Sequence, residues 1–135
     1  QHIRREKATS NICTAQGFMC LCVACYLSLM GEKGLREVNE TSYAGAHHLH
    51  DELLKTGLFA EVHPEEPFLN EFTLRCTKGK EVLAAFRREM AERHGILAGV
   101  VAEGSENEVI WAVTEQCSEA DMTCLIEKAA AYGKA

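Results

Sequence analysis

The most apolar stretch of the chain lies near its beginning and predicts a helix over residues 12–31. Residues 18–27 contain no charged side chain, and the apolar pattern continues through Leu29 and Met30 to Gly31, which can end the helix. Because this helix would be apolar on every side, we expect other structure to cover it all round. Its length suits a buried core helix, since a membrane span needs about 20 apolar residues.

The remainder of the chain combines helical and alternating patterns. A second long helix is expected from Gly34 to Gly57. Its apolar face consists of Leu35, Val38, Ala46, Leu49 and Leu53. Strands are expected around 58–62, 72–76, 96–101 and 109–114, and helices over 82–94 and after a capping box at Ser118-Glu119-Ala120-Asp121. This order predicts a small mixed or antiparallel sheet with helices packed on one face, which is an α+β domain.

Composition narrows the class of protein further. The 135 residues are 47% hydrophobic and 25% charged, as in ordinary globular proteins. Fourteen Lys and Arg against twenty Asp and Glu give a net charge of −6, so we expect no nucleic-acid partner. The chain opens at Gln1 with eleven mostly polar residues, and we interpret it as the back part of a longer polypeptide.

The seven cysteines do not suggest a disulfide scaffold. Their number is odd, and Cys13, Cys20, Cys22 and Cys25 all fall in the first predicted helix. On that helix Cys20 lies about 200° from Cys22, so three thiolates could not meet one metal ion. We therefore expect reduced cysteines packed as small hydrophobic residues in a cytoplasmic protein, and no metal site.

The remaining polar and aromatic residues that could carry chemistry are explained by their expected places on the surface or in the core. His47, His48 and His50 are expected on an exposed face of the second helix. Trp111 is expected in the core. The third helix should have a solvated polar face with local ion pairs, formed by Arg87, Arg88, Glu89, Glu92 and Arg93. The pattern alone thus indicates an α+β domain without an evident catalytic group.

The opening segment is the most specific motif of the chain. Residues 1–16 read QHIRREKATSNICTAQ. This motif resembles the P protein of the glycine cleavage system, glycine dehydrogenase (decarboxylating), in its N-terminal half or its subunit 1. Shorter supporting matches are residues 26–37, Asn70-Glu71-Phe72 and Val113-Thr114-Glu115. Cys20, Cys22 and Cys25 depart from the Ala and Leu that the family leads us to expect.

The resemblance implies a fold and a division of the chain. The family is similar to the pyridoxal-phosphate aminotransferases, in which a large cofactor domain is followed by a long connecting helix and a small C-terminal α+β domain. Residues 1–11 would then end the large domain, 12–31 would form the connecting helix, and 32–135 would form the small domain.

The resemblance also implies a reaction. It would be decarboxylation of glycine with pyridoxal phosphate and transfer of the aminomethyl group to the lipoyl H protein, in the cytoplasm and without a membrane partner. The cofactor lysine would belong to subunit 2 or the catalytic half, so the fragment alone would be inactive. Lys7 is rejected for this role, because its polar neighbours offer no desolvation that would lower its pKa.

The resemblance assigns binding roles to the opening loop. Thr9, Ser10 and Asn11 would offer donors to the phosphate of the partner subunit's cofactor, and Arg4, Arg5 and Lys7 would add positive charge at the interface. Alternatively, Ser10 and Asn11 only cap the helix, and the basic residues only join the two halves.

Two other functions stay open at this point. One is another enzyme of the aminotransferase fold, similar to a cysteine desulfurase. The other is a metal- or redox-sensing module that uses the cysteines.

Overall fold

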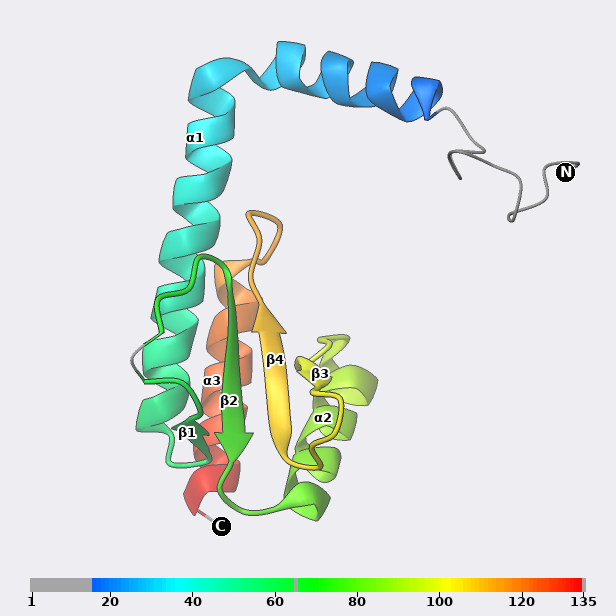
Figure 1. Ribbon diagram of the computed structural model, residues 1–135. Helices are drawn as coiled ribbons and strands as arrows, with labels where there is room; N and C mark the ends of the chain where they lie inside the picture. The colour runs from blue at the N-terminus through cyan, green and yellow to red at the C-terminus, as the bar shows by residue number, and fades with distance from the viewer. Residues whose placement is uncertain (1–15, 65, 135) are drawn as a thin grey trace, which may run out of the picture. The chain divides into compact units, whose positions relative to one another are not determined.

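The computed structural model describes residues 16–64 and 66–134 (Figure 1). The elements in chain order are α1 (Gly17–Lys55), β1 (Phe59–Glu61), β2 (Glu71–Cys76), α2 (Lys80–His94), β3 (Val100–Val101), β4 (Glu108–Ala112) and α3 (Glu119–Lys134). The chain forms two compact units with their boundary between Leu35 and Arg36, so α1 contributes to both.

Helix α1 contains a break where the sequence predicts the end of a helix. Gly31 has φ 61° and ψ −176°, a conformation that glycine adopts far more readily than other residues. The predicted break is therefore confirmed. The chain resumes helical geometry directly afterwards, so the expected non-helical connection between Gly31 and Gly34 is absent from the described chain.

The part of α1 that precedes Gly31 is exposed, contrary to expectation. Phe18 and Leu29 are 76% and 86% exposed, and Cys20, Cys22 and Cys25 are exposed as well. The prediction that these cysteines are buried is wrong for the described residues, because a helix that is apolar on every side cannot cover its own side chains. An 18-residue window of α1 has a mean hydropathy of 1.4, enough for a membrane span by composition. Core helices of soluble proteins meet the same criterion, so this one helix does not identify a membrane protein.

The second unit is built on a four-stranded antiparallel sheet with strand order β1-β2-β4-β3. The expected α+β class is confirmed. In the central pair β2 and β4, Phe72 lies opposite Trp111 and Leu74 opposite Val109, and all four are buried. Thr73 and its neighbours in register lie on the other, more exposed face. One face of the sheet therefore carries the core, as the alternating pattern predicts.

Three helical segments supply the other side of this core (Figure 1). Their buried residues are Ala46, Leu49 and Leu53 of α1, Leu83, Phe86 and Met90 of α2, and Leu125 and Ala129 of α3. Trp111 is 3% exposed and packs edge to face with Phe59, with ring centroids 5.4 Å apart. The predicted core positions Ala46, Leu49, Leu53 and Trp111 are thus confirmed, whereas Leu35 and Val38 of the predicted apolar face are only half-buried and lie outside the core.

Two charged residues of α2 contact other elements instead of facing solvent. Arg87 donates to the carbonyl oxygens of Ala98 and Gly99, at 3.1 and 2.9 Å. These bonds hold the chain after α2 as a loop, so strand β3 begins at Val100 and not at the predicted Ile96. The expectation of a solvated Arg87 is wrong, because the loop carbonyls need a donor.

Glu89 joins α2 to α3. Its carboxylate accepts hydrogen bonds from the Tyr132 hydroxyl at 2.8 Å and from Lys128 at 3.3 Å. The bond from Tyr132, followed by that from Lys128, lowers the pKa of Glu89, and the same bond to Glu89 raises the pKa of Tyr132. At the start of α3, the backbone N–H of Asp121 donates to Ser118 Oγ at 3.1 Å, which confirms the predicted N-cap.

We predict that Gly133→Ala lowers the free energy of unfolding by about 1 to 3 kcal/mol, because a Cβ atom there would overlap the carbonyl oxygen of Thr56. A helical glycine replaced by alanine normally gains about 0.5 to 1 kcal/mol. Gly34→Ala is the control, since its Cβ would meet only the flexible Met30 side chain. Urea unfolding of both variants measures the difference, and a stabilised Gly133→Ala would contradict the close packing.

Candidate functional site

Two short motifs, Asn70-Glu71-Phe72 and Val113-Thr114-Glu115, meet at one end of the β2–β4 pair. The backbone N–H of Val113 donates to the carbonyl oxygen of Asn70 at 3.0 Å. The side-chain amide of Asn70 donates back to the carbonyl oxygen of Val113 at 3.3 Å. These reciprocal bonds bring together residues that are far apart in the sequence.

A groove of about 570 Å³ opens beside this junction, within the second unit. Helix α1, the segment that enters β2 and the segment that leaves β4 each contribute to it. Its lining residues are Val38, Asn39, Glu40, Ser42, Tyr43, Leu69, Asn70, Thr114 and Glu115. The groove therefore combines apolar walls with side chains able to form hydrogen bonds, which is the usual composition of a binding site. We take it as the candidate functional site.

The polar groups of the groove favour binding over covalent chemistry. Ser42 is 8% exposed and donates its hydroxyl to the carbonyl oxygen of Val38 at 2.8 Å, so it is engaged in the helix. Among the described residues that line the groove, the charged ones are Glu40 and Glu115. The groove thus attracts positively charged or hydrogen-bond-donating groups and disfavours anions.

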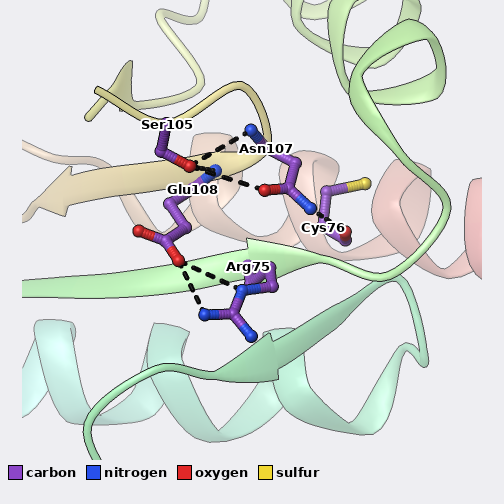
Figure 2. A network of polar contacts seen from close by, with 5 residues as sticks. All are labelled: Arg75, Cys76, Ser105, Asn107 and Glu108. Carbon is purple, nitrogen blue, oxygen red and sulfur yellow. Dashed lines mark hydrogen bonds and ion pairs between the residues drawn. The ribbon is translucent and has the colours of Figure 1, made fainter. Parts of the chain in front are cut away.

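The opposite end of the β2–β4 pair carries a polar network (Figure 2). Arg75 donates twice to Glu108 Oε1, at 3.1 and 2.7 Å, from the directly opposite strand position. The Asn107 amide donates to the carbonyl oxygen of Cys76 at 3.4 Å, and the Cys76 N–H donates to the carbonyl oxygen of Asn107 at 2.8 Å. Ser105 Oγ accepts the Glu108 N–H at 3.2 Å. This network has a structural role, because its groups satisfy one another.

The three histidines of α1 differ in their surroundings. His48 is exposed as expected, whereas His47 and His50 are partly buried. His47 stacks on Phe68, with ring centroids 4.1 Å apart, and its Nε2 lies 3.2 Å from the Phe68 carbonyl oxygen. The prediction of exposure is wrong for His47 and His50, because the segment between β1 and β2 folds over this side of α1.

The site residues predicted from the opening motif lie outside the described residues. They are Arg4, Arg5, Lys7, Thr9, Ser10 and Asn11. Their assignment to a cofactor phosphate or to the subunit interface therefore stays a prediction. Within residues 16–64 and 66–134, no group of three or more His, Cys, Asp or Glu side chains is arranged to hold a metal ion.

The groove itself was not predicted from the sequence. Asn70 and Glu115 belong to the family-like motifs, whereas no motif in the sequence includes Tyr43. The available signal was the presence of those two motifs at the ends of neighbouring strands. Only the antiparallel register shows that they meet.

Solved structures define the class of fold. The chain matches the glutamate decarboxylase domain of a diaminobutyrate-pyruvate transaminase and L-2,4-diaminobutyrate decarboxylase from Vibrio parahaemolyticus. The TM-score is 0.61 over 87% of this chain and 26% of that one, at 19% identity. At this identity the match shows the fold alone, an α+β arrangement shared with a decarboxylase domain.

Closer similarity identifies the family. The model of the family "Glycine cleavage system P-protein" matches residues 1–128, so the chain belongs to this family. A crystal structure of glycine decarboxylase (P-protein) of the glycine cleavage system, in inhibitor-bound form, matches 98% of the chain with 40% identity and a TM-score of 0.76. The match covers 30% of that protein.

Curated relatives agree with this assignment. The probable glycine dehydrogenase (decarboxylating) subunit 1 of Thermomicrobium roseum is 39% identical over 94% of this chain and 28% of its own length. The protein of the same name from Methylococcus capsulatus is 45% identical over 75% of the chain and 21% of its own length. The chain therefore spans less than a third of the length of these relatives.

The described residues do not by themselves fit the pyridoxal phosphate that the resemblance implies. The groove has two carboxylates, which repel a phosphate, and its lining includes no lysine. Lys80 and Lys128 pair with carboxylates elsewhere. A hydrogen bond to Glu52 raises the pKa of Lys55, which favours the ammonium form over the free amine that bonds to the cofactor.

We predict that Asn70→Ala lowers the free energy of unfolding by about 0.5 to 1.5 kcal/mol, because it removes the donor to Val113. Asn107→Ala removes the equivalent bond at the opposite end of the strands and should lose a similar amount. Urea unfolding compares the two variants. Wild-type stability of Asn70→Ala would show that its amide does not hold the junction beside the groove.

Proposed function

We propose that the chain is part of glycine dehydrogenase (decarboxylating) subunit 1, which acts in the cytoplasm in the glycine cleavage system. The observation that carries the proposal is the similarity over nearly the whole chain: a family match over residues 1–128 and a P-protein structure at 40% identity. The reaction is decarboxylation of glycine with pyridoxal phosphate, followed by transfer of the aminomethyl group to the lipoyl H protein.

In this proposal the chain completes an assembly and does not carry the reacting lysine. Subunit 2, or the catalytic half of a single-chain enzyme, supplies the lysine that holds the cofactor, and pyridoxal phosphate supplies the electron sink for loss of the carboxylate. The exposed apolar residues before Gly31 support this interpretation, since the remaining parts of such an enzyme would cover them.

The function is tested on two assemblies. One combines the full-length protein with its catalytic partner, and the other is the same assembly without the segment that corresponds to this chain. The complete assembly should release carbon dioxide from labelled glycine in the presence of lipoyl H protein, and the truncated one should not. The 135-residue chain alone should neither release carbon dioxide nor retain pyridoxal phosphate through dialysis. A complete assembly that does not act on glycine would contradict the proposal.

The opening loop is tested in the full two-part enzyme with Thr9→Ala combined with Ser10→Ala. Cofactor binding should weaken by about 1 to 3 kcal/mol for each hydrogen bond to the charged phosphate that is lost, while the subunits stay associated. Fluorescence titration with pyridoxal phosphate and sedimentation measure the two properties. Thr9→Ser with Ser10→Thr keeps both hydroxyls and serves as the control. Unchanged cofactor affinity, or dissociation of the subunits, would mean that the loop is structural.

A further inference from the structure

The groove beside α1 has two carboxylates without a cationic neighbour. Glu40 lies on α1 and Glu115 follows β4, and both residues are exposed. Glu115 accepts a hydrogen bond from the side-chain amide of Gln116 at 3.4 Å, but among the described residues neither glutamate has an ion pair. At the opposite end of the same strands, the carboxylate of Glu108 lies 2.7 Å from a guanidinium nitrogen. The groove therefore carries two negative charges that this chain does not neutralise.

Two large apolar side chains of the groove are exposed as well. Tyr43 is 48% exposed and follows Glu40 by three residues, so the two side chains share one face of α1. Leu69 is 74% exposed and lies just before β2. The Tyr43 ring packs against that of His47, with ring centroids 4.1 Å apart. The groove therefore holds an aromatic ring in a fixed place beside a carboxylate.

A side chain that fits this groove has a cationic end and an apolar stem. Arginine and lysine have this form, since their aliphatic parts cover apolar surface while their charged ends reach polar groups. Arginine suits the groove better, because its guanidinium packs flat on an aromatic ring and its five N–H donors reach acceptors on several elements. Besides the two carboxylates, the groove offers the side-chain oxygen of Asn70, since it is the amide nitrogen that bonds to Val113.

We propose that the groove receives an arginine side chain of the catalytic partner subunit, with its guanidinium between Glu40 and Glu115 and its aliphatic part on Tyr43 and Leu69. This docking rests on the proposed function, in which the chain joins a partner, as the name subunit 1 of its relatives implies. The net charge of −6 also favours a basic surface on that partner. The groove then joins two subunits and does not take the substrate.

The docking is tested by titration calorimetry of the full-length protein with its catalytic partner, at about 50 mM and about 300 mM salt. Glu40→Lys combined with Glu115→Lys should weaken association about tenfold or more at the lower salt concentration, because both new positive charges repel the arginine. The dissociation constant of the wild type should rise with salt, whereas that of the variant should not. Both glutamates are exposed, so the fold should be unchanged, and far-UV circular dichroism checks this.

The matched control is Glu92→Lys combined with Glu127→Lys, which changes the net charge equally at exposed positions outside the groove. This control should associate like the wild type, which separates the groove from a general effect of charge. Glu40→Gln combined with Glu115→Gln removes the two charges without adding repulsion, so it should weaken association less than the lysine variant. Hydrogen exchange in residues 38–43 should slow when the partner is added, because the groove is then covered.

Unchanged association of the groove variant, or equal weakening of the groove variant and the control, would overturn the docking. Loss of self-association of the full-length protein in the groove variant, with partner binding intact, would also overturn it and make a second copy the occupant. Release of carbon dioxide from glycine by the wild-type assembly tests the proposed function separately. An active wild-type assembly whose groove variant associates normally refutes the docking alone, whereas a wild-type protein that binds no catalytic partner refutes both.

Discussion

The antiparallel pairing of β2 with β4 is the contact on which the rest of the second unit depends. It places Phe72 against Trp111 and Leu74 against Val109, and so makes one continuous apolar surface from two segments far apart in the sequence. All three helical segments bury their apolar faces on this surface. Without the pairing, each helix would expose an apolar stripe that its own residues cannot cover.

The two ends of this strand pair have the same pattern of hydrogen bonds but differ in their surroundings. At each end an asparagine amide donates across the pair and a backbone N–H returns the bond: Asn70 with Val113, and Asn107 with Cys76. The Asn107 end adds Arg75 and Glu108 and has its polar groups satisfied (Figure 2). The Asn70 end leaves a groove open beside α1. The candidate binding groove therefore lies at the Asn70 end.

Helix α1 differs in its apolar pattern and in its exposure on the two sides of Gly31. After Gly31 it is amphipathic and buries Ala46, Leu49 and Leu53 in the core. Before Gly31 it is apolar on every side and exposed in the described chain. This contrast fits a family whose members are more than three times as long as the segment they share with this chain. The exposed helix is the described segment whose apolar side chains are least covered by the chain itself.

The sequence by itself determined the elements whose signal is local. The alternation of Phe72, Leu74 and Cys76, the helical spacing of Leu83, Phe86 and Met90, and the cap at Ser118 were all predictable, because each depends on residues close together in the chain. The resemblance of the opening motif was also enough to indicate the family.

Only the tertiary structure decided what depends on contacts between distant segments. It placed His47 and His50 under the segment before β2, directed Arg87 to the loop carbonyls of Ala98 and Gly99, and joined Asn70 to Val113 beside the groove. A polar residue on a helix has the same local pattern whether it faces solvent or a neighbouring strand. The role of such a residue therefore depends on the element that packs against it. The strand register and the path of the loops determine which element that is.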